Sequence, residues 1–221
     1  MKPLIFQGCL FDLDGTLVSS IESVNRTWRV LIEKYDLDMA EVLSFIQGRP
    51  ADESVRELLY MYPSTVINRE TSWLKKQESE DTEGVVSISS CLTFLNQLDA
   101  LGVPWGIVTS CNQQVAIARM KAAKIPFPKV MITFEDVRQG KPDPDPYLLG
   151  AEKLGIEPKS CLVFEDAPAG VTSATKAGCG VFGILSHFSI GQLSLEHGAE
   201  NYDQLDVKDV KPNWWQICFK Q

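Results

Sequence analysis

Five short apolar segments recur along the chain, and each is rich in valine, isoleucine, leucine or phenylalanine. Apolar runs of this length, bounded by polar residues or glycine, are typical of strands that are buried on both faces of a sheet. We therefore expect strands at residues 4–11, 105–110, 130–134, 160–166 and 180–185.

Between these runs the apolar residues return every three or four positions, which is the spacing of one helix face. This pattern predicts helices at residues 90–101, 113–123, 145–154 and 169–177, and a glycine follows three of them as a C-terminal cap would. The alternation favours an α/β fold in which helices cover both faces of a doubly wound, Rossmann-like parallel sheet. The last apolar segments flank Pro212-Asn213, which predicts a C-terminal hairpin.

Residues 18–82 interrupt this alternation, because they lack a convincing strand and show only helical spacing. The expected helices are 22–34, 40–46, 52–60 and 66–76. We interpret 18–82 as a helical cap domain inserted into an α/β core domain formed by residues 1–17 and 83–221. The polar, acidic run at 77–84 favours a hinge between the two domains.

The composition limits the classes of partner. With 221 residues, 44% hydrophobic and 23% charged, the chain has ordinary globular values, and its net charge of -8 disfavours nucleic acid and anionic membranes as partners. The apolar run at 4–11 is too short for a signal peptide and lacks a small-residue cleavage site. The six scattered cysteines lack the spacing of a zinc site or a disulfide framework. We expect reduced cysteines in a cytoplasmic protein that is a monomer.

Polar side chains follow three of the predicted strands, and one more lies in a loop between strands. Because the carboxyl ends of parallel strands meet at one edge of a sheet, these side chains should converge on one crevice. Four acids with two hydroxyls and a lysine suit a divalent cation bound together with a phosphate better than a buried core. The residues are Asp12, Asp14, Thr109, Ser110, Lys141, Glu165 and Asp166.

In their order along the chain these motifs resemble those of the haloacid dehalogenase superfamily of phosphotransferases. The motif DxDGT[LV] is matched at residues 12–17, the hydroxyl motif by Thr109, the basic motif by Lys141 in "GKPDPDPY", and the acidic motif by Glu165 and Asp166 in "EDAPAG". The segments "TEG", "PWGIVTS" and "PDPYLLGAEKLG" are more narrowly similar to bacterial sugar phosphatases. That group is also similar to deoxyglucose-6-phosphate and glycerol-3-phosphate phosphatases.

The chemistry that the resemblance implies agrees with the residue types. An ionised Asp12 can attack phosphorus to form an aspartyl-phosphate, and Asp14 can act as general acid and then as general base. Lys141 would neutralise charge on the phosphoryl oxygens, and Thr109 and Ser110 would donate hydrogen bonds to them. We therefore expect a Mg²⁺-dependent phosphomonoesterase that acts on small sugar or polyol phosphates.

Mg²⁺ suits a site in which all the ligands are oxygen atoms. The expected ligands are the carboxylates of Asp12 and Asp166 and the backbone carbonyl of Asp14. Glu165 would bind the ion directly or through water, or serve only as a structural hydrogen-bond partner.

Substrate selection is expected in the cap, at the "QGRP" segment of residues 47–50. Gly48 permits a tight approach, and Arg49 offers several donors to hydroxyls or to a second anionic group. Related phosphatases carry a substrate-selecting loop at the matching position. Alternatively, Arg49 lies in solvent at the start of a helix.

Two other functions stay open. Sugar-phosphate mutases of the β-phosphoglucomutase type usually carry a histidine about a dozen residues after the nucleophile, where this chain has Val24. A phosphate-binding regulatory module would bind without turnover.

Ser19 replaces an aspartate that many relatives carry, which affects the hinge more than catalysis. We expect no reactive thiol at Cys111 and interpret His187 and His197 as solvated residues.

Overall fold

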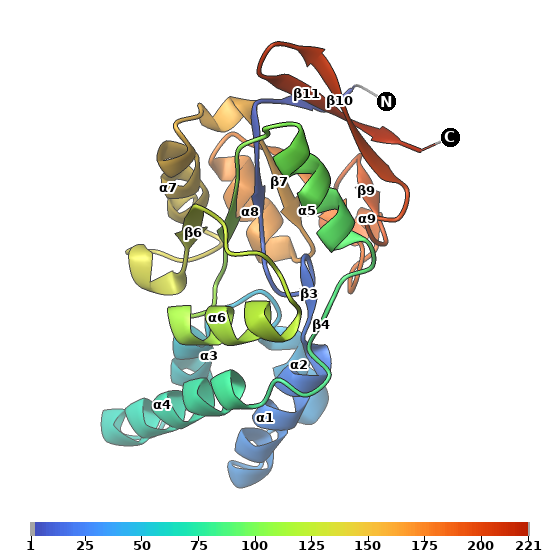
Figure 1. The fold of residues 1–221 in the computed structure, drawn as a ribbon. Coiled ribbons are helices and arrows are strands. Elements are labelled where there is room, and N and C mark those ends of the chain that lie inside the picture. Colours follow the sequence, from blue (N-terminus) through green and yellow to red (C-terminus); the bar gives the residue numbers. More distant parts are fainter. Residues whose placement is uncertain (1–2, 221) are drawn as a thin grey trace.

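The computed structural model describes residues 3–220 and is built on a six-stranded parallel sheet with the order β6-β5-β2-β7-β8-β9 (Figure 1). The strands are β2 (Gly8–Phe11), β5 (Trp105–Val108), β6 (Val130–Ile132), β7 (Cys161–Glu165), β8 (Gly180–Ile184) and β9 (Gly198–Ala199). The first strand along the chain to enter this sheet, β2, lies between β5 and β7, and its four residues are buried. The predicted α/β fold with a parallel sheet is confirmed.

Helices cover both faces of this sheet. They are α5 (Cys91–Ala100), α6 (Gln113–Ala122), α7 (Asp145–Leu154), α8 (Pro168–Lys176) and the short α9 (Ile190–Leu193), with 3-10 turns at Phe134–Asp136 and Pro158–Ser160. Side chains of α5 and α6 pack into one apolar cluster with Phe11, whose ring stacks on Phe164 with centroids 4.6 Å apart. Side chains of α7 and α8 belong to a second cluster that includes Leu10. The sheet is therefore doubly wound.

Four helices form a separate layer beyond the carboxyl ends of the strands, as Figure 1 shows. They are α1 (Ile21–Lys34), α2 (Met39–Phe45), α3 (Ala51–Leu58) and α4 (Ser64–Glu80). Their apolar faces share a cluster of their own around Trp28, Leu31 and Leu74. The chain enters and leaves this layer through two short antiparallel strands, β3 (Val18–Ser19) and β4 (Val86–Ser87).

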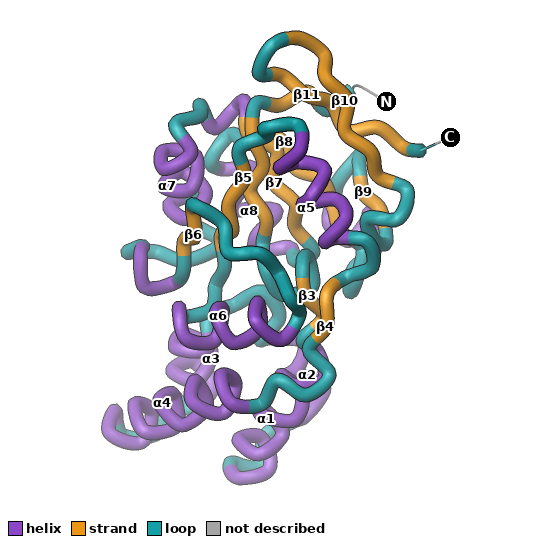
Figure 2. Tube along the Cα trace, in the orientation of Figure 1, coloured by secondary structure: helices purple, strands orange, loops and turns teal. Residues whose placement is uncertain are grey.

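A second sheet lies at the end of the molecule opposite these four helices (Figure 2). Its strands are β1 (Ile5–Phe6), β10 (Leu205–Lys211) and β11 (Trp214–Phe219). Strands β10 and β11 form the predicted hairpin, with Asn213 in the left-handed conformation at a φ of 61°. The single strand expected at 4–11 is split at Gln7, because β1 pairs with β11 whereas β2 enters the parallel sheet.

Other boundaries also differ from the prediction. The hinge expected at 77–84 begins later, because α4 continues to Glu80. Residues 1, 2 and 221, with which the expected core domain begins and ends, lie outside the described residues. Among residues 3–220, no helix combines the length and the apolar character needed to cross a membrane.

Candidate active site

The polar residues at the strand ends converge on one site. Asp12 follows β2, Thr109 follows β5 and Asp166 follows β7, and all three side chains are buried. Lys141 reaches the same place from the loop before α7 and is only 3% exposed. The parallel register of the three strands brings their carboxyl ends together, which is why residues far apart in the sequence meet here.

Lys141 lies between two carboxylates. Its Nζ donates to Asp12 Oδ1 at 2.6 Å, to Glu165 Oε1 at 2.6 Å and to the carbonyl oxygen of Val108 at 2.9 Å. Burial alone would lower the pKa of Lys141, but its attraction to Asp12 and Glu165 outweighs burial and raises that pKa above its usual value. The lysine therefore stays a cation beside Asp12.

Glu165 is held from several sides. Its Oε1 accepts from the Tyr147 hydroxyl at 2.7 Å, and its Oε2 accepts from the backbone N–H groups of Asp166 and Ala167 at 3.1 and 3.2 Å. A Cβ at Gly170 would overlap this carboxylate, so glycine is required there. Tyr147 was not among the predicted site residues, although its position six residues after Lys141 could have indicated that it lies near the site.

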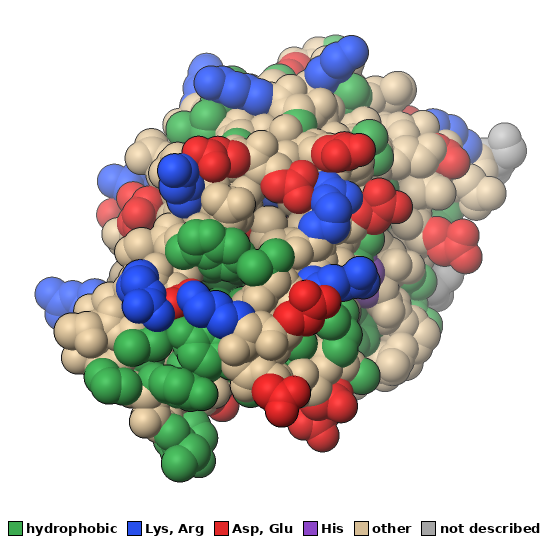
Figure 3. All heavy atoms as spheres, turned by 90° about the horizontal axis from the view of Figure 1, so that it is seen from below, with side chains coloured by type: hydrophobic (Ala, Val, Ile, Leu, Met, Phe, Trp, Pro, Cys, Tyr) green, Lys and Arg blue, Asp and Glu red, His purple; other side chains and the backbone are tan. Residues whose placement is uncertain are grey.

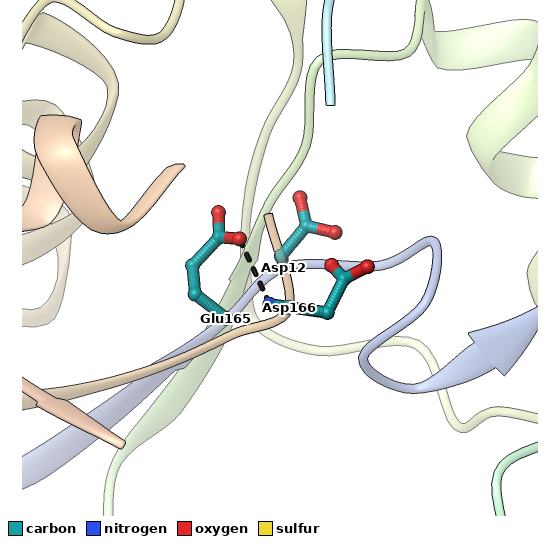
Figure 4. A group of neighbouring side chains, drawn as sticks. All are labelled: Asp12, Glu165 and Asp166. Atoms are coloured by element: carbon teal, nitrogen blue, oxygen red, sulfur yellow. Dashed lines mark hydrogen bonds between the residues drawn. The ribbon is translucent and has the colours of Figure 1, made fainter. Parts of the chain in front are cut away.

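Asp12, Glu165 and Asp166 form a buried acidic cluster in which one oxygen of each carboxylate lies within 4.8 Å of the others. Figure 4 shows Asp12 and Asp166 turned toward the same side, with Glu165 apart from them and bonded to the Asp166 N–H. Burial raises the pKa of Asp12 well above its usual value, against the pull of Lys141. Burial likewise raises the pKa of Asp166 to about 6. Crowded, desolvated oxygen donors of this kind fit a hard divalent cation.

His187 lies in an exposed loop, as expected for a solvated residue, but it also contacts this cluster. Its Nδ1 lies 3.0 Å from Asp166 Oδ2 and 2.9 Å from the Ser186 hydroxyl. The hydrogen bond to Asp166 raises the pKa of the imidazole. Nothing in the sequence near His187 indicates this contact, because it depends on how the loop after β8 returns to the sheet edge.

Asp14 has a different set of partners from Asp12. Its Oδ1 accepts from the Ser20 hydroxyl at 2.6 Å, and its Oδ2 contacts Arg119 Nη1 at 2.7 Å and Cys111 Sγ at 3.0 Å. Burial, and then the charge of Asp14, raises the pKa of the Cys111 thiol well above its usual value, which keeps it protonated. The sequence reasoning missed Arg119, although a charged residue on the buried face of α6 was a usable signal.

A cavity of about 950 Å³, its open mouth included, lies between the strand ends and the four-helix layer. Gly48 and Ser110 lie on its wall, where the Ser110 hydroxyl donates to the carbonyl oxygen of Gly48 at 3.2 Å. Gly48 has a φ of 71°, and a Cβ there would come within 2.7 Å of the Ala167 Cβ. The close approach that glycine permits at this position is therefore between the backbone of Gly48 and Ala167.

Arg49 also lines the cavity, but its guanidinium is engaged within the four-helix layer. Its Nη2 donates to Glu57 at 2.6 Å, and the group lies 4.0 Å from the centre of the Phe45 ring. The expectation that Arg49 selects the substrate stays a prediction.

The face seen from below in Figure 3 carries basic and acidic side chains side by side, with hydrophobic side chains gathered in part of it. Exposed hydrophobic residues of the four-helix layer include Val30, Tyr60 and Met61.

Comparison with known proteins gives the same motifs a wider context. A model of the family described as haloacid dehalogenase-like hydrolase matches residues 9–184. The chain is 44% identical over 178 residues to Hexitol phosphatase A of Escherichia coli (strain K12), which covers 80% of this chain and 82% of that protein.

A second relative matches over nearly the whole chain. Validoxylamine A 7'-phosphate phosphatase of Streptomyces hygroscopicus subsp. limoneus is 31% identical over 216 residues, which is 96% of this chain and 97% of that protein. Among solved structures, a β-phosphoglucomutase from Clostridium difficile superposes with a TM-score of 0.81 over 91% of this chain and 93% of its own, at 18% identity. At that identity the likeness shows the fold alone.

Proposed function

Because the chain belongs to the haloacid dehalogenase-like hydrolases, we propose that it is a Mg²⁺-dependent phosphatase of small sugar or polyol phosphates. The observation that carries the proposal is the buried Lys141, which joins Asp12 to Glu165 beside Asp166 at the strand ends. The names of the two similar phosphatases, a hexitol phosphatase and a validoxylamine A 7'-phosphate phosphatase, support the substrate class.

The reaction divides into two displacements at phosphorus. In the first, an oxygen of the Asp12 carboxylate forms a bond to phosphorus while the ester P–O bond breaks, and Asp14 gives its proton to the departing alkoxide. In the second, Asp14 takes a proton from water as the water oxygen attacks phosphorus, and the bond to Asp12 breaks to release inorganic phosphate. Lys141, Thr109 and Ser110 stabilise the negative phosphoryl oxygens throughout.

Asp12, Asp166 and the backbone carbonyl of Asp14 would hold Mg²⁺, which when bound supplies positive charge beside the transferred phosphoryl group. Glu165 is better suited to bind through water than directly. Both of its oxygens are already engaged, Oε1 by Lys141 and Tyr147 and Oε2 by backbone N–H groups.

The cavity wall supports a small polyhydroxylated leaving group. From the four-helix layer it receives Asn25, Asp52 and Lys75, which offer donors and acceptors, together with the flat apolar surface of Trp28. Lys75 Nζ lies 2.6 Å from Asp52 on this wall. Apolar side chains such as Leu43 and Ile46 complete the lining, and an apolar wall with a few polar groups is typical of sites that bind small molecules.

A mutase of the β-phosphoglucomutase type remains the second candidate, because the fold is shared. Val24 stands on the cavity wall where those mutases usually carry histidine, and its side chain has no group that transfers a proton. We therefore rank hydrolysis above phosphoryl transfer between sugar hydroxyls. A binding module without turnover ranks last because Asp12, Asp14 and Lys141 are all present.

A turnover panel tests the proposal. Hexitol phosphates, hexose 6-phosphates, glycerol phosphate and p-nitrophenyl phosphate are each incubated with enzyme and Mg²⁺, and released phosphate is measured. Rapid release from the polyol or sugar esters, lost in Asp12→Asn, is expected. Isomerised sugar phosphate without free phosphate would favour the mutase, and saturable binding without release would favour the module.

A further inference from the structure

We infer that Arg119 is a positioning residue for Asp14, a role that rests on the proposed phosphatase activity. Its guanidinium holds the Asp14 side chain at the strand end, where the protonated carboxyl can give its proton to the leaving group. Arg119 Nη1 lies 2.7 Å from Asp14 Oδ2, and its side chain is only 3% exposed. It is the one cation that pairs with Asp14 among residues 3–220.

The place of Arg119 in the fold argues against a chance contact. It lies on the face of α6 that also carries Val115, Ala116 and Met120, all of which are buried. A guanidinium among apolar neighbours is costly to desolvate unless an anion compensates for the lost water. Asp14 supplies that anion at the edge of the cavity.

The two aspartates pair with different cations. Asp12 receives its cation from Lys141 at 2.6 Å, whereas Asp14 receives Arg119 from a different element. The other Asp14 oxygen accepts from the Ser20 hydroxyl, which comes directly before α1. Both oxygens are therefore fixed, and the carboxylate cannot rotate freely.

The four-helix layer supports the guanidinium from the opposite side. Glu78 Oε1, on α4, lies 3.7 Å from Arg119 Nη2, and the same oxygen accepts from Trp28 Nε1 at 3.1 Å. The neighbouring Ser79 hydroxyl accepts from Gln114 of α6 at 3.0 Å. The Arg119 side chain thus extends from α6 toward α4, and its orientation depends on both helices.

Part of the guanidinium is buried without a hydrogen-bond partner among residues 3–220. Within the described part of the chain, Arg119 Nε and Nη2 have no hydrogen-bond partner, although both atoms are buried and the side chain lines the cavity. Buried donors of this kind are uncommon in a purely structural arginine, which normally satisfies them.

Positioning of a general acid has a specific kinetic signature. An alkoxide leaving group needs the proton of Asp14 when the ester bond breaks, whereas p-nitrophenolate leaves without one. The ratio kcat/KM reports the steps up to the transfer of phosphorus to Asp12. Loss of Arg119 should therefore lower kcat/KM for a polyol phosphate and largely spare kcat/KM for p-nitrophenyl phosphate.

The experiment compares Arg119→Met and Arg119→Lys with Lys121→Met, a matched control at an exposed position of the same helix. We expect Arg119→Met to lower kcat/KM by about 100-fold for the polyol phosphate and by less than about 5-fold for p-nitrophenyl phosphate. Arg119→Lys should recover part of the polyol activity, and Lys121→Met should match wild type. Arg119→Met should also release a burst of p-nitrophenol before slow turnover, because Asp14 is needed as base in the second step.

Equal losses of kcat/KM on both esters, or no loss on either, would overturn the role of Arg119. If Arg119→Met does not fold, the same comparison is made with Arg119→Lys. A wild-type ratio of kcat/KM for the polyol phosphate to kcat/KM for p-nitrophenyl phosphate would then overturn the role of Arg119. If wild type releases no phosphate from polyol phosphates, the proposed substrate class fails by itself. The test of Arg119 then uses phenyl against p-nitrophenyl phosphate, whose leaving groups differ in the same way.

Discussion

Replacing Lys141 by methionine removes the cation that joins Asp12 to Glu165 and keeps a side chain of similar length. Each Nζ–oxygen distance is 2.6 Å, for which the gross attraction is about 6 kcal/mol at an effective dielectric constant of about 20. The desolvation cost of burying the three charges offsets much of this attraction. Removing one partner of a buried ion pair typically lowers the free energy of unfolding by about 3–5 kcal/mol, because the remaining charges lose their compensation.

We therefore expect Lys141→Met to lower the free energy of unfolding by about 3–5 kcal/mol in the presence of a chelator, which is about 10 °C in Tm for a chain of this size. This loss of stability should be smaller at acidic pH. Asp12 has a raised pKa, so it takes up a proton there and no longer needs a cation beside it. Turnover of any phosphate ester should fall by at least about 100-fold, because Lys141 also stabilises the phosphoryl oxygens.

Urea unfolding followed by tryptophan fluorescence measures the stability, with Lys153→Met, an exposed lysine of α7, as the matched control. The double variant Lys141→Met/Glu165→Gln should regain part of the loss, because one buried negative charge is removed with the positive one. A loss of less than about 1 kcal/mol in the free energy of unfolding for Lys141→Met would contradict a stabilising role for this ion pair. So would a double variant less stable than the single one.

Four further predictions concern the nucleophile, the metal, pH and specificity. Asp12→Asn should abolish phosphate release, because the amide cannot form the acyl-phosphate. Tm should stay within a few degrees of wild type, because the amide keeps the size of the carboxylate and Lys141 keeps Glu165 as its anion; near-normal turnover would rule out covalent catalysis. A chelator should stop turnover, Mg²⁺ should restore it and Ca²⁺ should restore it poorly, because its coordination is longer and looser; full activity in excess chelator would contradict the metal site. Without metal, unfolding free energy should fall as pH rises from about 4 to about 6, because the folded pKa of Asp166 is about 6 against an unfolded value of about 3.9; Asp166→Asn should flatten this decline, and an unchanged profile would count against the shift. Arg49→Ala should lower kcat/KM by ~10- to 100-fold for polyol phosphates and much less for p-nitrophenyl phosphate; equal losses would assign Arg49 to closure or phosphate binding.

Much of the candidate site could be located from the sequence because its residues follow strands. A strand buried on both faces is visible as a short apolar run, and the polar residue that ends it must lie at the carboxyl edge of a parallel sheet. The positions of Asp12, Thr109 and Asp166 at strand ends therefore predict that they lie together. Their observed burial at adjacent strand ends agrees with this prediction.

Helix boundaries at the hinge could not be predicted in the same way. The run at 77–84 is polar, which favours a loop, but glutamine and glutamate are also good helix formers. Packing decides between the two, because Glu78 is buried and accepts from Trp28 Nε1. That contact extends α4 to Glu80.

Most strands and helices of the core, and the acids at the strand ends, can be located from the sequence alone, since periodicity and strand termini are local properties of the chain. Only the tertiary structure decided which partner each acid receives. Arg119 meets Asp14 across 105 positions, and His187 reaches Asp166 through a loop without regular periodicity. Such pairs depend on how α6 and the loop after β8 pack against the sheet edge. Electrostatic attraction acts through space, so the spacing of residues along the chain does not reveal it.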